Sequence, residues 1–162
     1  MQKLQQQINP FLWFDDQAEE AANYYVSTFD DSSITEVSRY PENTPGPAGS
    51  VMTVTFTLKG QEIIALNGGP EFAFSPAISL FVHCRDQDEV DRYWSTLTDG
   101  GQSQQCGWVT DRFGVTWQIV PDRLLELMAD PDPGRANRVM QAMLQMDKIE
   151  IKTLEDAANA SD

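Results

Sequence analysis

Apolar and polar residues alternate most clearly in the first half of the chain. Residues 51–58, with the sequence VMTVTFTL, place large apolar side chains on one side of a strand and mostly threonines on the other. Because side chains alternate between the faces of a strand, this pattern predicts a sheet with one covered face. Lys59-Gly60 then turns the chain into a second predicted strand over residues 61–66, which completes a hairpin.

A helical pattern precedes this hairpin. After an apolar run over residues 8–14, Asp16 and Glu19 have the spacing of a capping box, which predicts the start of a helix. Apolar and aromatic residues then recur every three or four positions as far as Phe29, as they do on the buried side of a helix. The polar residues 30–33 end this helix, and residues 34–40 are predicted to form a strand.

The second half of the chain repeats the first. Residues 77–84 have the pattern of a strand, and Asp86 and Glu89 repeat the Asp-x-x-Glu start of a helix. A shift of 70 residues superposes the two helix starts and places Phe11 on Phe81. The chain is therefore predicted to contain two copies of strand–helix–strand–strand–strand, the second with shorter strands. Each copy buries little alone, so the copies are expected to pair.

The second copy ends in the segment CGWVTDRFGVTWQIVP, residues 106–121. Gly114 stands where a hairpin loop needs a positive φ, and Asp111 can accept hydrogen bonds from the backbone ahead of it. In the strand that follows, Trp117 lies on one face and Gln118 on the other. An amide between bulky apolar neighbours needs a partner if it is buried. A cross-strand hydrogen bond and a ligand contact both satisfy that need.

Past Pro121 the sequence predicts helices. Residues 124–128 and 136–144 carry apolar stripes on either side of the breaker 130–134, and residues 149–158 suggest a last, weaker helix. The second stripe is rich in methionine and needs a surface to cover, either a second subunit or the chain's own sheet. We expect a single domain over residues 1–122, with modules at about 8–70 and 77–121. The tail, residues 123–162, is expected at a homodimer interface.

Charge and composition narrow the range of partners. Twenty-five acidic residues against 11 basic ones give a formal net charge of −14, which repels phosphate backbones and anionic lipid. Neither nucleic acid nor a membrane is therefore an expected partner. The sequence shows no signal peptide or membrane-spanning run, and its two cysteines are too few for a disulfide framework. We expect a cytoplasmic protein with reduced thiols.

A few side chains are candidates for chemistry. His83 is the only histidine, so a site built on several histidines of one chain is excluded. By alternation it shares a strand face with Ser79 and Phe81, where it can act as a general base or be merely exposed. Cys106 precedes Gly107 and can present a thiol at a cavity mouth or lie buried and inert. Arg112, in the hairpin turn, can pair with a neighbouring carboxylate or reach a ligand.

Three segments together resemble a known family. NPFLWFDDQAEEAANYYVSTF, ALNGGPEFAFSPAISLFV and CGWVTDRFGVTWQIVP resemble the PhnB-like proteins of the vicinal oxygen chelate superfamily, which includes glyoxalase I, extradiol dioxygenases and bleomycin-resistance proteins. The resemblance covers about residues 8–154. It implies an α+β fold in which paired βαβββ modules form a cupped mixed sheet around a cavity, with a C-terminal helical tail. The subfamily is often labelled 3-demethylubiquinone 3-methyltransferase, but the sequence has no glycine-rich strand-to-helix loop for S-adenosylmethionine.

The resemblance also implies where a metal would be held. Enzymes of the superfamily carry the ligands on the first and last strands of each module, and these positions correspond here to Pro10 (or Asn9), Asn67, Ser79 and Gln118. All of these residues are neutral, whereas divalent metals need histidine or carboxylate ligands to compete with water. We therefore expect neither a metal nor another cofactor.

These observations lead to one main expectation and two alternatives. We expect a metal-independent small-molecule-binding protein whose ligand is unknown. The expected ligand-binding residues are Asn67, Ser79 and Gln118 for hydrogen bonds, Phe14, Phe56 and Trp108 for apolar contact, and His83. The first alternative is an enzyme (a lyase, isomerase or transferase) that uses His83 or Cys106 in the cavity between the modules. The second is a structural dimer with a collapsed cup.

Overall fold

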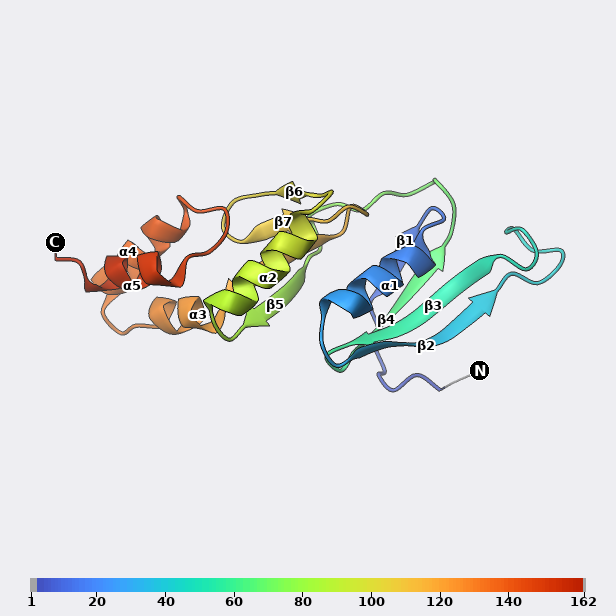
Figure 1. Cartoon of the computed structure of the whole chain (residues 1–162), viewed down its shortest axis with the longest axis horizontal. Coiled ribbons are helices and arrows are strands. Elements are labelled where there is room, and N and C mark those ends of the chain that lie inside the picture. Colours follow the sequence, from blue (N-terminus) through green and yellow to red (C-terminus); the bar gives the residue numbers. More distant parts are fainter. Residues whose placement is uncertain (1–2, 162) are drawn as a thin grey trace. The chain divides into compact units, whose positions relative to one another are not determined.

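The computed structural model describes residues 3–161, and they fall into two compact units that divide between Phe74 and Ser75. The division lies in the segment that separates the two expected modules. It assigns the C-terminal helices to the same unit as the second module (Figure 1). In the described range, no helix combines the length and the apolar character needed to cross a membrane.

The first unit is a four-stranded mixed sheet with one helix. Its elements are β1 (Phe11–Phe14), α1 (Ala18–Thr28), β2 (Ser32–Arg39), β3 (Val51–Leu58) and β4 (Gln61–Asn67). The strand order is β1-β4-β3-β2; β1 runs parallel to β4 and the other pairs are antiparallel. Helix α1 packs on one face of this sheet, where Tyr25 of the helix stacks on Phe56 of β3. The predicted βαβββ module is confirmed, although β1 begins three residues later than the apolar run that predicted it.

The second unit repeats this topology with shorter strands. It contains β5 (Leu80–Cys84), α2 (Gln87–Thr98), β6 (Gln102–Ser103), β7 (Trp108–Thr110) and β8 (Thr116–Pro121). The order is β5-β8-β7-β6, with β5 parallel to β8, so each strand takes the place of its counterpart in the first sheet. The predicted α+β fold of two such modules with a helical tail is confirmed.

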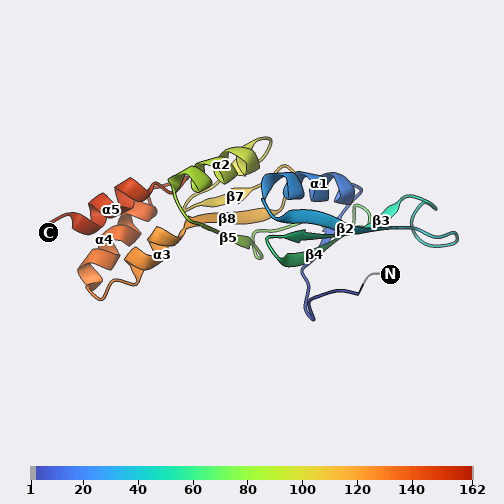
Figure 2. The same ribbon diagram turned by 60° about the horizontal axis from the view of Figure 1, so that its bottom comes forward.

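Helix α2 lies along one face of the second sheet (Figure 2). The buried residues Trp117 and Ile119 of β8 and Val109 of β7 belong to that face. The opposite side, which we call the helix-free face, follows from the strand register. It consists of Phe81, His83, Trp108, Thr110, Thr116, Gln118 and Val120.

The turn between β7 and β8 is built around Asp111, which is buried. One of its carboxylate oxygens accepts hydrogen bonds from the backbone N–H of Phe113 at 2.8 Å and of Val115 at 3.1 Å. The other accepts from the indole N–H of Trp117 at 2.8 Å. Gly114 has a φ of 90°, a conformation that glycine adopts without a side-chain penalty. Both roles predicted for this turn are confirmed, and Asp111 also ties it to the core under α2.

The two helices begin differently. At α2, Asp86 accepts a hydrogen bond from the Glu89 N–H at 2.9 Å, so the predicted cap is confirmed. At α1 the prediction is wrong, because the residue before the helix is Gln17 and no local side chain caps it. Instead, the side-chain oxygen of Asn67, at the end of β4, accepts from the Ala18 N–H at 2.8 Å.

The tail forms a small core of its own. Helices α3 (Asp122–Met128), α4 (Pro133–Met143) and α5 (Ile151–Asn159) confirm the predicted helical tail. Their apolar sides meet in a cluster of buried residues that also includes the end of β8, namely Val120, Leu124, Leu127, Val139, Ile149, Leu154 and Ala158. Met128, Met143 and Met146 pack against this cluster. The methionine-rich stripe therefore packs against the other tail helices, and Val120 is the strand residue of this cluster.

Candidate functional site

Gln118 is the centre of the helix-free face of the second sheet. Its side-chain N–H donates to the Ser79 hydroxyl oxygen at 3.0 Å, across 39 residues of sequence. Ser79 lies directly before β5, and the parallel register between β5 and β8 brings the two side chains together. Both residues are half-buried. Two of the predicted site residues therefore meet, and the cross-strand hydrogen bond expected of Gln118 exists.

Aromatic side chains flank Gln118 on both neighbouring strands. Phe81 of β5 and Trp108 of β7 are its register partners, so the three side chains form one row across the sheet. Phe81 is 42% exposed and Trp108 is half-buried. We call Phe81, Gln118 and Trp108 the Gln118 row. Trp108 was predicted as a site residue, whereas Phe81 was recognised only as sharing a strand face with His83.

His83 lies beside the Gln118 row. Its ring stands edge-on to Phe81 at a centroid distance of 4.9 Å, and its Nδ1 lies 3.2 Å from a carboxylate oxygen of Asp122. The side chains of His83 and Asp122 are 62% and 48% exposed. A contact this open to water contributes little to stability, but it orients the imidazole next to the row.

Thr116 adds an unsatisfied group to the same face. It lies two positions before Gln118 on β8 and is 2% exposed. Among the described residues, its hydroxyl is a buried side-chain oxygen with no hydrogen-bond partner. Buried hydroxyls are normally paired, so this one indicates an unmet hydrogen-bonding demand next to Gln118. No signal in the sequence identifies this group, because alternation assigns a face but not a bonding partner.

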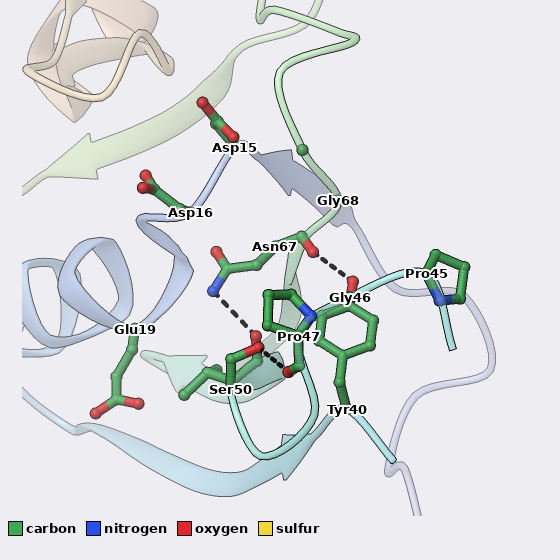
Figure 3. A pocket seen from close by; sticks show the side chains of 12 residues that line it. Asp15, Asp16, Glu19, Tyr40, Pro45, Gly46, Pro47, Ser50, Asn67 and Gly68 are labelled. Carbon is green, nitrogen blue, oxygen red and sulfur yellow. Dashed lines mark hydrogen bonds between the residues drawn. The ribbon is translucent and has the colours of Figure 1, made fainter. Parts of the chain in front are cut away.

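Asn67 lies elsewhere, in a pocket of the first unit with a volume of about 500 Å³ (Figure 3). The pocket lies at the start of α1, and three carboxylates line it, those of Asp15, Asp16 and Glu19. Its wall also includes Tyr40, whose hydroxyl donates to the Asn67 backbone oxygen. Gly46 packs flat on the Tyr40 ring, where an added Cβ would come within 2.4 Å of it.

The side chain of Asn67 joins the start of α1 to β3. Its oxygen caps α1, and its amide N–H donates to the Val51 backbone oxygen at 3.2 Å. Asn67 does not occupy the position in the first sheet that Gln118 occupies in the second. Ile64 is the residue of β4 that pairs with Phe11, as Gln118 pairs with Phe81. The internal counterpart of Gln118 is therefore Ile64.

The remaining positions assigned by resemblance have structural partners. Asn9 is the counterpart of Ser79 under the 70-residue shift. Its amide donates to the backbone and side-chain oxygens of Glu62 at 3.1 and 2.9 Å. The Pro10 carbonyl accepts from the Ile64 N–H at 3.1 Å, as a continuation of the strand pairing.

Phe14 and Phe56 lie on the covered side of the first sheet. They are 3% and 0% exposed. Phe14 contacts Phe74 edge-on at a centroid distance of 5.0 Å, and Phe56 stacks on Tyr25 of α1. Both are core residues in this structure, since alternation groups side chains by face without telling which face the helix covers. On the other side of the sheet, β1 exposes Phe11.

The two cysteines occupy different environments. Burial raises the pKa of the Cys84 thiol to about 12, with the Glu89 carboxylate contributing in the same direction, so this thiol stays protonated. Cys106 is half-buried, has a φ of 60° and directs its thiol at the Met143 backbone oxygen at 3.7 Å. The N–H groups of Cys106 and Gly107 donate to the backbone of Met146 and Asp147, so the segment anchors the tail.

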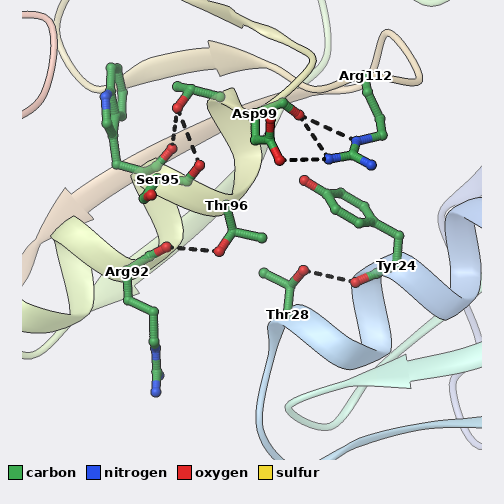
Figure 4. A network of polar contacts seen from close by, with 9 residues as sticks. Tyr24, Thr28, Arg92, Ser95, Thr96, Asp99 and Arg112 are labelled. Atoms are coloured by element: carbon green, nitrogen blue, oxygen red, sulfur yellow. Dashed lines mark hydrogen bonds and ion pairs between the residues drawn. The ribbon is translucent and has the colours of Figure 1, made fainter.

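Arg112 has a partner within its own unit. Its guanidinium donates to the Asp99 backbone oxygen at 3.0 Å and lies 3.3 Å from the Asp99 carboxylate (Figure 4). Asp99 follows the last residue of α2, so the contact joins the β7–β8 turn to the helix end. The adjacent carboxylate of Asp111 accepts hydrogen bonds within the turn itself.

The described residues contain no group of three or more His, Cys, Asp or Glu side chains arranged to hold a metal ion. At the positions assigned by resemblance, Ser79 and Gln118 offer neutral hydroxyl and amide groups. Such groups orient a polar ligand by hydrogen bonds rather than by charge.

Comparison with known proteins identifies relatives. The family model of 3-demethylubiquinone-9 3-methyltransferase matches residues 6–120. A protein from Bacillus cereus described as a putative 3-demethylubiquinone-9 3-methyltransferase, PhnB protein, is 40% identical over 72% of this chain and 99% of that chain, with a TM-score of 0.66. Protein PA1353 from Pseudomonas aeruginosa is 22% identical over 72% of this chain and 97% of its own, with a TM-score of 0.60. No curated protein matches the sequence. The predicted PhnB-like resemblance is confirmed.

Proposed function

Because the chain belongs to the family described as 3-demethylubiquinone-9 3-methyltransferase, which the sequence relates to the vicinal oxygen chelate proteins, we propose that it binds a small molecule without a metal. The proposed site is the helix-free face of the second sheet around Gln118. The observation that carries the proposal is the hydrogen bond between Ser79 and Gln118. Gln118 lies between two aromatic side chains, the exposed Phe81 and the half-buried Trp108.

The composition of the site supports binding of a neutral molecule. Apolar surface with a few placed hydrogen-bonding groups is the usual makeup of a small-molecule site. Phe81 and Trp108 supply the apolar surface, and Ser79 and Gln118 supply hydroxyl and amide groups. A neutral amide binds a polar ligand without the cost of burying a charge.

The family description names a methyl transfer, but the residues here do not support that reaction. A methyltransferase that uses S-adenosylmethionine needs a place for the cofactor, commonly a glycine-rich loop between a strand and a helix with an acidic residue after it. The link between β1 and α1 reads Asp15-Asp16-Gln17, and the link between β5 and α2 reads Arg85-Asp86. Neither link contains glycine, so we propose binding rather than methyl transfer.

The strongest observation for an enzyme is the orientation of His83. A histidine held by a carboxylate beside a binding face is a plausible arrangement for a general base. The exposure of both His83 and Asp122 leaves the pair open to solvent, however, and this weakens the case. Cys106 is a weaker candidate for a catalytic role, because its thiol faces a backbone oxygen of the tail.

We also propose that the protein is a homodimer in the cytoplasm. The tail gives limited support, because most of its apolar residues are packed within the chain. Leu125 of α3 and Leu144 after α4, each 43% exposed, remain available for contact. If they contribute to the dimer, changing both to lysine should shift the mass in light scattering toward the monomer, whereas Lys152→Ala should leave it unchanged.

Two measurements test the proposed binding. Native mass spectrometry of the protein purified from its own host should detect a bound small molecule. Gln118→Leu should reduce that occupancy and weaken rebinding by about 1–2 kcal/mol, the scale of a lost hydrogen bond with its unpaired partner. Gln61→Leu makes the same exchange at an exposed position of β4 and should have no effect. If Gln118→Leu unfolds the protein while the wild type carries no small molecule, Gln118 is structural and the proposal is wrong.

A further inference from the structure

The hydrogen bond between Gln118 and Ser79 fixes which polar groups of the site are left for a ligand. The Gln118 amide donates one N–H to the Ser79 oxygen. A hydroxyl that accepts in this way still has its own hydrogen to donate, and the Gln118 carbonyl oxygen is an acceptor with two lone pairs. The face therefore presents a donor at Ser79 beside an acceptor at Gln118, and the second N–H of the Gln118 amide is a further donor.

A ligand that satisfies both groups needs the complementary order. It must offer an acceptor to Ser79 and a donor to Gln118, on adjacent atoms of one edge. A C=O group next to an N–H group, as in a lactam, has that order. A carboxylate offers only acceptors; it can accept from the Ser79 hydroxyl and the second Gln118 N–H, but it leaves the Gln118 oxygen without a donor.

The neighbouring strands determine the shape of the ligand. Adjacent strands lie about 4.8 Å apart, so Phe81 and Trp108 stand close on either side of the amide. Aromatic side chains in such positions favour contact with another flat ring, edge-on or offset. The Gln118 row itself carries no charged residue, which favours an uncharged ring.

We propose that the Gln118 row binds an uncharged planar ring whose edge carries adjacent C=O and N–H groups, the chemistry of an aromatic lactam. The inference rests on the proposed function and names the ligand class for that site.

The first unit provides an internal contrast. The row at the same place in its sheet consists of Phe11, Ile64 and Thr55, so an aliphatic side chain replaces the amide. An aromatic residue is present on the outer strand in both rows. The lactam contact is therefore expected in the second unit only.

The test uses the full chain and two matched compounds, 2-quinolinone and N-methyl-2-quinolinone, titrated by NMR. The two share ring and carbonyl, but only the first has the N–H. 2-Quinolinone should bind roughly three- to tenfold more tightly, the range of one neutral hydrogen bond. Gln118→Leu should abolish that difference. Trp108→Leu should weaken both compounds, and Gln61→Leu should change neither.

Ser79→Ala provides a second variant if Gln118→Leu folds poorly, because it removes the donor and should weaken both compounds similarly. Equal affinity of the two compounds for the wild type would overturn the proposal. So would a preference that survives in Gln118→Leu, or no binding of 2-quinolinone up to its solubility limit.

The outcome for the ligand class is separable from the outcome for the proposed function. If neither quinolinone binds but the protein from its own host carries a small molecule that Gln118→Leu loses, the lactam class is wrong and the binding function stands. If the host protein carries nothing and no compound responds to Gln118→Leu, both fail.

Discussion

In the first sheet, β4 places Ile64 beside Phe11, while in the second sheet β8 places Gln118 beside Phe81 at the corresponding position. The strand order and the parallel pairing around these positions are the same in both units. At the centre of the row, the first sheet has an aliphatic side chain where the second has a hydrogen-bonding amide. The repeated topology supplies a frame, and the residue at the centre of the row determines which hydrogen-bonding groups that frame presents.

The units also differ in the length of their strands and in the contacts outside the strands that support each sheet. In the first, β2 and β3 have 8 residues each, while their counterparts β6 and β7 have 2 and 3. The shorter second sheet relies on the buried Asp111 turn and on the helical tail. The longer first sheet instead has an N-terminal arm, residues 5–9, which is fixed to Glu62 at the start of β4.

Removing the Asp111 carboxylate from the turn between β7 and β8 should produce the largest effect on stability. Asp111→Ala leaves three N–H groups in or near the core without their acceptor, so we expect a loss of about 3–5 kcal/mol. Urea unfolding followed by tryptophan fluorescence measures it. The turn of the first unit, Lys59-Gly60, uses no buried side chain, and Lys59→Ala should cost less than about 0.5 kcal/mol. Similar losses for both variants would contradict the contrast between the turns.

The arm of the first unit should depend on Glu62, which is 5% exposed. Its carboxylate accepts from the Gln5 N–H at 3.0 Å and from the Asn9 amide at 2.9 Å. The side-chain oxygen of Gln6 accepts from the Glu62 backbone N–H at 2.6 Å, and the side-chain N–H of Gln6 donates to the Glu62 backbone oxygen at 3.1 Å. These two bonds replace those that a neighbouring strand would make.

Glu62→Ala should cost about 2 kcal/mol, because those donors lose a buried acceptor. The arm should become the first site of limited proteolysis, and amide exchange should rise over residues 5–9. Glu62→Gln keeps a carbonyl oxygen and should lose less. An arm equally protected in Glu62→Ala would show that Gln6 alone holds it.

The two helix caps should differ in how far their loss spreads. Asn67→Ala removes the cap of α1 together with the contact to Val51, whereas Asp86→Ala removes one local cap of α2. We expect losses of about 1–2 and about 1 kcal/mol. Hydrogen exchange should rise at α1, β3 and β4 for Asn67→Ala, but only at the start of α2 for Asp86→Ala. Purely local changes in both would remove the distinction.

The smallest predicted effect concerns transfer of the amide between units. Gln118→Ile together with Ile64→Gln exchanges the centres of the two rows, with a change in stability of about 1 kcal/mol or less, since both positions are half-buried. The preference for 2-quinolinone should be lost, because the first sheet places Asn9, not a serine, next to the new amide. A preference retained in the exchanged protein would show that the row alone suffices.

Much of the architecture was predictable because its signals are local. Alternation over residues 51–58, the Asp86 cap and the Asp111–Gly114 turn each act within a few residues, and the 70-residue repeat of these signals predicted two modules. The faces of β8 followed from the same alternation, which separated Gln118 from Trp117 before any partner was known.

Tertiary structure decided the contacts that join distant segments. Ser79 meets Gln118 across 39 residues, and Asn67 caps α1 across 49, because strand register brings them together. The covered face of the first sheet depends on where α1 packs, which made Phe56 a core residue. The tail buried its own apolar stripe because three helices could meet over Val120. Periodicity states which side of an element is apolar, but only packing determines what covers that side.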